Sequence, residues 1–108
     1  MSPVPELAPA EARHLLQEAG SLGAILDVRE PWEYALVHLP GSLHIPMGDI
    51  PERLEELNPD RTYVVMCHHG SRSQRVAAFL QSRGFRQVAN AAGGIDAWAG
   101  EDPSLPRY

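Results

Sequence analysis

Short apolar runs are spaced along the chain and are separated by turn-forming residues. The strongest run covers 62–67 (TYVVMC), and shorter runs cover 23–28 (GAILDV) and 86–90 (RQVAN). Runs of this length that are bounded by turn residues predict buried strands. Proline and glycine punctuate 38–46, which predicts an extended loop with a short strand at 42–45.

Apolar residues recur at helical spacing in the segments between these runs. The segment 9–19 starts at a proline suited to a first helical position and is followed by Gly20, so we expect a helix there. The clearest helix is predicted over 73–83, with Gly84 as its stop. Its apolar face consists of Val76, Ala77 and Leu80.

Three shorter helices complete the pattern. Pro31 opens the first of them, and we expect the second over 48–59, with Asp49 as its N-cap. The third comprises one or two turns within 93–100 (GGIDAWAG), and the tail 101–108 is expected to be irregular.

Strands and helices alternate along the chain, which predicts an α/β fold. In this class a central, mostly parallel sheet carries helices on both faces, and ligands bind at the carboxyl ends of the strands. A chain of 108 residues is long enough to bury a core without disulfides or a structural metal. We therefore expect residues 1–108 to form one domain.

The composition excludes several function classes. All nine basic residues are arginine, so no lysine of this chain forms a Schiff base. A net charge of −5 argues against nucleic acid as a partner, since phosphate binding needs a basic surface. One cysteine makes no internal disulfide, and the sequence shows neither a leader nor an apolar run of membrane length. We therefore expect a cytoplasmic protein that binds no membrane.

The only cysteine, Cys67, ends the strongest predicted strand, and the loop after it leads directly into a helix. The first amides of a helix have no partner within the helix, so here they are expected to point toward the sulfur. A free thiol has a pKa of about 8.5 and is only partly ionised at neutral pH. Hydrogen bonds to a charged group contribute about 1.5 to 3 kcal/mol each, more than a helix dipole supplies at an exposed site. The junction therefore predicts an activated thiolate nucleophile.

An ordinary buried cysteine is the alternative, because cysteine is among the residues most often found in cores. The neighbouring residues argue against it. Gly70 allows a tight path, Ser71 and Ser73 are small and suit helix capping, and Arg72 pairs with anions. These residues are poor core partners and good anion ligands.

The charged and titratable residues of the loop allow more than one role. Arg72 is either a solvated charge or a partner for an anionic substrate, and the dipole cost of a cation in the first helical turn favours the second role. His68 and His69 are either polar loop residues or contributors to positive potential and proton transfer. Adjacent residues seldom converge on one metal ion, and no metal-ligand spacing accompanies them, so we expect no metal site.

Three segments of the chain resemble those of a known family. The loop 67–73 (CHHGSRS) resembles the active-site loop of single-domain rhodaneses, which are sulfurtransferases. The segment 25–50 (ILDVREPWEYALVHLPGSLHIPMGDI) is similar to the Asp-Val-Arg, Glu-Tyr and His-Ile-Pro-Gly signature of that family, and 91–98 (AAGGIDAW) resembles its closing Gly-Gly and Trp segment. The resemblance covers residues 8–100, and its main departure is Val37, where the family usually has glycine.

The resemblance implies the rhodanese fold and a site for sulfur transfer. Cys67 matches the nucleophile that carries sulfur as a covalent persulfide, and no other cofactor is implied. Asp27 and Arg29 resemble polar supports near the site, although a buried ion pair that only holds the strand end is the favoured interpretation. The residues that match the anion-binding loop are His68, His69, Gly70, Ser71, Arg72 and Ser73.

The resemblance also implies a mechanism and its partners. The Cys67 thiolate takes the outer sulfur of thiosulfate or another small anionic donor, and cyanide, a thiol or a protein acceptor then removes it. One alternative is a sulfur carrier or regulatory module that loads sulfur with little turnover. Another is a cysteine phosphatase or arsenate reductase, but the related phosphatase loop is one residue longer than 67–72, which favours sulfur over a phosphoryl group.

Overall fold

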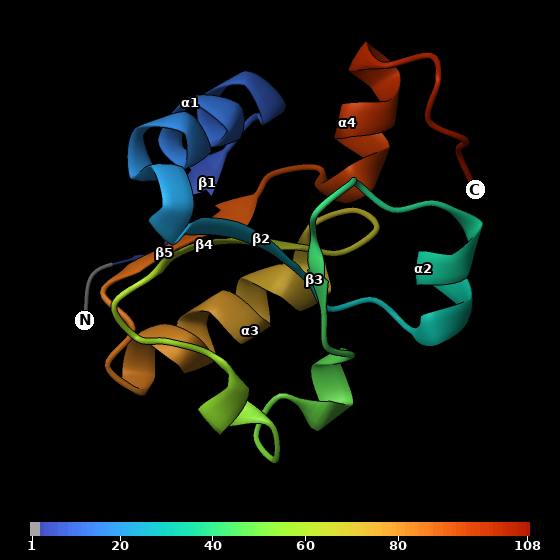
Figure 1. Ribbon diagram of the computed structural model, residues 1–108. Coiled ribbons are helices and arrows are strands. Elements are labelled where there is room, and N and C mark those ends of the chain that lie inside the picture. Colours follow the sequence, from blue (N-terminus) through green and yellow to red (C-terminus); the bar gives the residue numbers. More distant parts are fainter. Residues whose placement is uncertain (1–2) are drawn as a thin grey trace.

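Five parallel strands form one sheet in the computed structural model, which describes residues 3–108. Their spatial order is β1-β5-β4-β2-β3, with β4 in the middle (Figure 1). All five residues of β4 are buried, which explains why this strand is apolar apart from Thr62 at its start. The strands are β1 (Glu6–Leu7), β2 (Gly23–Asp27), β3 (Leu43–His44), β4 (Thr62–Met66) and β5 (Gln87–Ala91).

Helices cover both faces of this sheet. Helices α1 and α4 lie on one face and α3 lies on the other, while α2 lies beside the edge strand β3 (Figure 1). The predicted α/β fold is thereby confirmed. None of the helices in the described part of the chain is long and apolar enough to cross a bilayer. The helices are α1 (Pro9–Ala19), α2 (Pro31–Leu36), α3 (Ser71–Ser82) and α4 (Gly94–Glu101).

Alternate residues of β4 point to opposite faces and build two halves of the core. Val64 and Met66 pack in the cluster on the side of α1 and α4, whereas Val65 and Cys67 pack in the cluster that includes α3. The alternation therefore places the cysteine sulfur on the face where α3 begins. Asp27 pairs in register with Met66, so β2 and β4 end together at the same edge.

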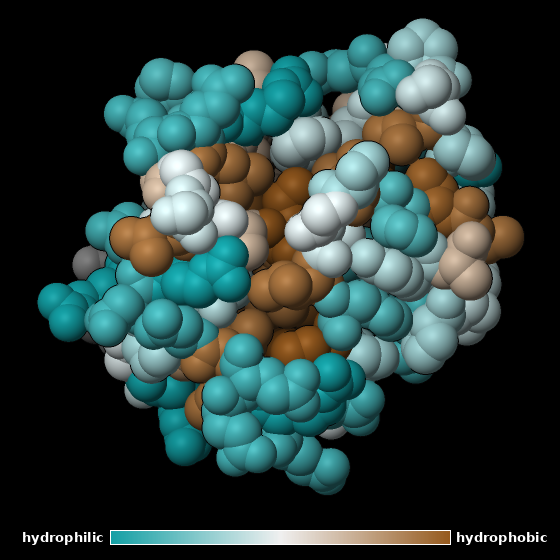
Figure 2. Space-filling view, in the orientation of Figure 1, coloured by the Kyte–Doolittle hydropathy of each residue, from teal (hydrophilic) through white to brown (hydrophobic). Residues whose placement is uncertain are grey.

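The surface of the face seen in Figure 1 is divided by polarity. Hydrophobic side chains form a band across its centre, and hydrophilic side chains lie above and below that band (Figure 2). A small apolar groove of about 180 Å³ is lined by Met47, Ile50, Pro51, Arg75, Val76 and Phe79, between α3 and the turns that precede it.

The structure differs from the sequence-based prediction in two segments. The predicted helix over 48–59 is wrong, because the chain forms two 3-10 turns, Met47–Asp49 and Leu54–Glu56. Pro51 has no amide hydrogen to continue a helix, and the turns let Ile50 and Leu57 enter the core. At the N-terminus, the unpredicted strand β1 adds to the sheet edge beside β5.

Candidate active site

The loop after β4 is held in a tight conformation by glycines. Gly70 has φ +109, a left-handed conformation that side chains rarely adopt, and it is the N-cap residue immediately before α3. Gly94, with φ +61, lies against the carbonyl oxygens of Cys67 and His68, where a Cβ atom would clash. The amide that follows it, of Ile95, donates to the Cys67 carbonyl at 2.9 Å. Helix α4 therefore fixes the position of the loop.

Three donors converge on the sulfur of Cys67. The Gly70 amide lies 3.1 Å from Sγ, the Ser73 amide 3.4 Å, and the Ser73 hydroxyl 3.2 Å. The residue is 1% exposed, so water competes little with these donors. Hydrogen bonds to a charged acceptor are about twice as strong as neutral ones, so these donors are placed to stabilise a negative charge on the sulfur. The predicted convergence of amides on the sulfur is present, although the cysteine also packs in the core.

The Ser73 hydroxyl has two acceptors for one proton. Its oxygen lies 2.5 Å from Oδ1 of Asn90 as well as within reach of the Cys67 sulfur. The Asn90 amide nitrogen donates to the Gly70 carbonyl at 2.9 Å and to the Glu6 carboxylate at 2.8 Å, which fixes which way the amide faces. When the sulfur is charged, the Ser73 proton is therefore drawn from Asn90 toward the sulfur.

A small pocket opens over the sulfur. Its volume is about 130 Å³, well below the roughly 300 to 1,000 Å³ of pockets for drug-sized ligands, so it suits a small ligand. The lining residues are Cys67, His68, His69, Ser71 and Arg72.

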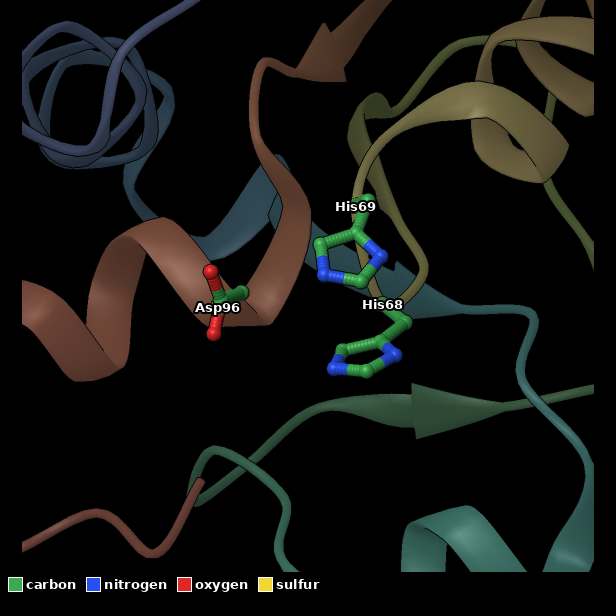
Figure 3. A group of neighbouring side chains, drawn as sticks. All are labelled: His68, His69 and Asp96. Atoms are coloured by element: carbon green, nitrogen blue, oxygen red, sulfur yellow. The ribbon is translucent and has the colours of Figure 1, made fainter. Parts of the chain in front are cut away.

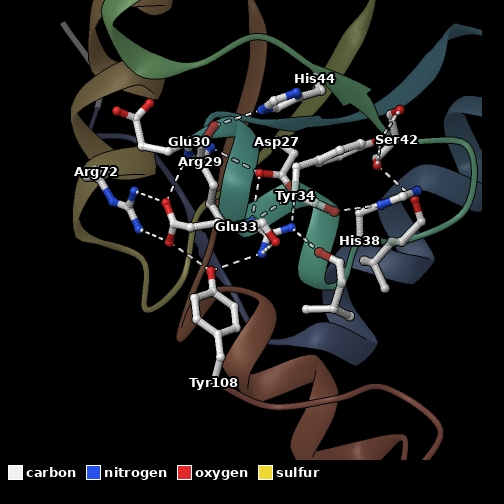
Figure 4. A network of polar contacts seen from close by, with 12 residues as sticks. Asp27, Arg29, Glu30, Glu33, Tyr34, His38, Ser42, His44, Arg72 and Tyr108 are labelled. Carbon is white, nitrogen blue, oxygen red and sulfur yellow. Dashed lines mark hydrogen bonds and ion pairs between the residues drawn. The ribbon is translucent and has the colours of Figure 1, made fainter.

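Arg72 is already engaged by a carboxylate. Its Nη1 and Nη2 atoms donate to the two oxygens of Glu33 at 2.7 and 2.9 Å (Figure 4). The Glu33 side chain is 4% exposed, and Tyr108 donates its hydroxyl to the same carboxylate at 2.8 Å. The hydrogen bonds from Arg72 lower the pKa of Glu33 to about 2, and the same pairing raises the pKa of Arg72. Arg72 is thus a paired cation, and its side chain is 35% exposed.

A second ion pair lies deeper beside the first. Arg29 Nη2 and Asp27 Oδ2 are 2.7 Å apart, and both side chains are fully buried. Arg29 also donates to the Val37 carbonyl at 2.6 Å. A further hydrogen bond runs from Arg29 to the Tyr108 hydroxyl at 2.9 Å (Figure 4). Burial lowers the pKa of Arg29, but the hydrogen bonds with Asp27 and Tyr108 outweigh it, so the pKa lies above its usual value. The expected buried ion pair is present at the end of β2.

The C-terminal tail reaches the rim of the pocket. The Tyr108 ring stacks on His68 with centroids 3.9 Å apart, and His68 in turn stacks on His69 at 3.8 Å. Arg107 makes two hydrogen bonds to the Asp96 carboxylate, at 3.1 and 3.0 Å. The tail is irregular, as expected, but it contributes side chains to the site.

His68, His69 and Asp96 form a group of metal-donor atoms at this rim (Figure 3). Their ligand atoms lie within 4.8 Å of one another, and Nε2 of His68 is buried without a hydrogen-bond partner among the described residues. Both oxygens of Asp96 accept a hydrogen bond from Arg107, so an ion at this place would share the carboxylate with that arginine. The two histidines therefore converge with a third donor that the sequence did not indicate.

The sequence profile of the rhodanese-like domain matches residues 8–101. The chain belongs to this family. Thiosulfate sulfurtransferase GlpE of Pseudomonas fluorescens is 36% identical over 96 residues, which are 89% of this chain and 86% of that protein. The candidate sulfur carrier protein YrkF of Bacillus subtilis is 37% identical over 100 residues, or 93% of this chain. The chain spans only 54% of the length of YrkF.

Solved structures show the same likeness to the rhodanese-like fold. A rhodanese-related protein from Thermoplasma volcanium has a TM-score of 0.82 and 28% identity, over 96% of this chain and 99% of that one. A rhodanese-like domain protein from Staphylococcus aureus has a TM-score of 0.81 and 30% identity, over 97% and 99% of the two chains.

The rhodanese-like site contains residues that the sequence indicated and, besides Asp96 at the rim, three that it did not. The loop residues 67–73 surround the sulfur or line the pocket, whereas Asp27 and Arg29 reach it only through other side chains. Glu33, Asn90 and Tyr108 were missed. Asn90 had a signal, because it is a polar residue inside an apolar strand and is 1% exposed. Glu33 also had one, because it is the glutamate of the Glu-Tyr signature in 25–50, whereas Tyr108 had none, since its partners are distant in the chain.

Proposed function

We propose that this rhodanese-like protein is a sulfurtransferase that moves a sulfane sulfur from thiosulfate or a related donor to a thiophilic acceptor. The observation that carries the proposal is the set of three donors on the Cys67 sulfur at the floor of a small pocket. The likeness to GlpE, a thiosulfate sulfurtransferase, supports it. Membership of the family alone does not choose the donor or the acceptor, so both belong to the proposal.

The reaction has two displacement steps. The Cys67 thiolate attacks the outer sulfur of thiosulfate, a new S–S bond forms, and sulfite leaves with the electron pair of the bond that breaks. Cyanide or a thiolate then attacks the outer sulfur of the persulfide, and the Cys67 thiolate is released. In both steps the negative charge on the Cys67 sulfur changes, and the amides of Gly70 and Ser73 are already in place to stabilise it.

Steady-state sulfite release tests the proposal. We expect the wild-type protein to turn over thiosulfate with cyanide or a thiol as acceptor, and Cys67→Ser to release no sulfite above background. Ser82→Ala is the control, because its exposed hydroxyl donates to the Phe79 carbonyl and Ser82 is not among the residues that line the pocket. Sulfite release by Cys67→Ser at a rate near that of the wild type would reject the role of the cysteine.

A sulfur carrier is the second candidate, and the likeness to YrkF over 93% of this chain favours it. A carrier loads Cys67 once and then waits for a protein acceptor, so it gives one burst of sulfite and stops. An enzyme continues with a small acceptor. The same kinetic experiment therefore separates the two.

A cytoplasmic location is part of the proposed function, since one free cysteine suits a reducing compartment.

A phosphatase is disfavoured by the state of the arginine. In a phosphate-binding loop the guanidinium would face the phosphoryl group, whereas both terminal nitrogens of Arg72 are bound to Glu33. Turnover of an aryl phosphate as fast as that of thiosulfate would reverse this ranking.

A further inference from the structure

Arg72 is the one permanently charged side chain among the residues that line the pocket. A doubly charged donor such as thiosulfate would need it, because the attacking sulfur is itself negative. However, both terminal nitrogens of the guanidinium face the Glu33 carboxylate (Figure 4). The pair as a whole adds no net charge to the pocket.

The carboxylate of Glu33 is held in place by more than Arg72. The Glu30 amide donates to Oε1 at 2.9 Å, and the Tyr108 hydroxyl donates to Oε2 at 2.8 Å. Tyr108 is itself held by Arg29, whose Nη1 donates to its hydroxyl at 2.9 Å. Four hydrogen bonds thus keep Glu33 ionised and oriented, with its pKa lowered to about 2 mainly by Arg72. A small anion has to compete with a buried, fully hydrogen-bonded carboxylate for the arginine.

We infer that Glu33 selects the sulfur donor by its charge: by neutralising Arg72, it makes the pocket favour an alkyl persulfide over thiosulfate. This inference rests on the proposed function and names the donor class of the same site. Thiosulfate brings two negative charges toward the thiolate, whereas a persulfide, R–S–SH, brings one at most. Like charges in a partly buried pocket repel strongly because water screens them poorly.

The persulfide reaction balances without an added charge. The Cys67 thiolate attacks the outer sulfur of R–S–SH, the donor S–S bond breaks, and R–S⁻ leaves with its electron pair. The proton stays on the transferred sulfur, so the products are the Cys67 persulfide and one thiolate. Neither an oxidant nor a metal takes part.

The test compares two donors in one substituted protein. Glu33→Gln removes the charge that neutralises Arg72 and retains a side chain of nearly the same shape. We measure kcat/KM for thiosulfate and for hydroxyethyl persulfide at about pH 8, above the ordinary pKa of histidine. The ratio of the thiosulfate value to the persulfide value should rise about tenfold, which corresponds to about 1.4 kcal/mol. The KM for thiosulfate should fall, and the change in the ratio should become smaller at high salt.

Two further variants make the result specific. Glu56→Gln is the matched control, because Glu56 also forms a two-fold hydrogen-bonded pair with an arginine, at 2.8 and 2.9 Å, on an exposed turn outside the pocket. It should leave the ratio unchanged. In the double variant Glu33→Gln/Arg72→Gln the rise should disappear. If Glu33→Gln does not fold, Arg72→Gln alone serves, and it should lower the ratio because Glu33 is then left negative.

The possible failures are distinguishable. If the wild type takes sulfur from neither donor onto Cys67, the proposed function fails. If it takes sulfur from both and folded Glu33→Gln keeps the wild-type ratio, or Glu56→Gln shifts the ratio equally, the selection by Glu33 is wrong and sulfur transfer stands.

Discussion

The hydrogen-bond donors around the Cys67 sulfur differ in charge and pairing from the ionic cluster beside them. The sulfur is surrounded by neutral N–H and O–H groups that point at one atom. The ionic cluster, formed by Asp27, Arg29, Glu33, Arg72 and Tyr108, contains full charges that are already paired with one another. In the proposed reaction, the first group stabilises the negative charge that the Cys67 sulfur gains and loses. The second group stabilises the fold around the sulfur.

The difference lies in what each group leaves unsatisfied. The amides of Gly70 and Ser73 have the sulfur as their acceptor, so they respond directly when its charge changes. Arg29 and Arg72 respond little, because each faces a carboxylate at 2.7 Å. In the proposed reaction, the polar groups that act most directly on the sulfur are therefore the uncharged ones.

The largest expected effect on stability comes from breaking the buried pair. Asp27→Ala leaves Arg29 charged and without its carboxylate in a fully buried position, which costs about 3 to 5 kcal/mol. Urea unfolding measures this loss. Glu56→Ala breaks the exposed pair with Arg53, which water screens, and should cost much less. Equal losses in the two variants would show that burial does not separate these pairs.

Acid tests the Glu33 pair. Its pKa is lowered from 4.5 to about 2 by Arg72, so the ionised form contributes stability above pH 4.5, and this stability is lost as the pH falls toward 2. The loss amounts to about 3 kcal/mol when the full shift is counted. Unfolding free energies of wild type and Glu33→Gln should therefore converge between pH 4.5 and 2. A constant difference over that range would contradict the paired state of Glu33.

A smaller effect, on the rate of sulfur loading, is expected from removing one hydrogen-bond donor to the Cys67 sulfur. Ser73→Ala removes the hydroxyl but retains the amide, so sulfur loading of Cys67 should slow about 10- to 100-fold, as expected for one hydrogen bond to a charged group. Ser82→Ala on the same helix is the control, with a rate near that of the wild type. Loading that is unchanged in Ser73→Ala would assign the stabilisation to the amides alone.

The same contrast explains how much could be predicted from the sequence. The groups that donate hydrogen bonds to the Cys67 sulfur lie within six positions of it in the chain. A predicted strand, a glycine and a helix start were therefore enough to place them. The partners in the ionic cluster are far apart: 39 positions separate Glu33 from Arg72 and 75 separate Glu33 from Tyr108. Only the folded sheet brings them together.

Local sequence patterns also predicted those parts of the fold that depend on residues close together in the chain. The helix predicted over 9–19 is α1, and the run 62–67 contains β4, because each pattern is strong within its own segment. The helix predicted over 48–59 is absent for a tertiary reason. Burial of Ile50 and Leu57, together with Pro51, outweighs the helical spacing of its apolar residues.

The intact mass of the protein after incubation with a sulfur donor tests the central claim most directly. With thiosulfate or hydroxyethyl persulfide, the wild type should gain one sulfur, about 32 Da, which a reductant removes. Cys67→Ser should gain nothing. A wild-type protein that stays unmodified with both donors, or an equal gain in Cys67→Ser, would contradict the account.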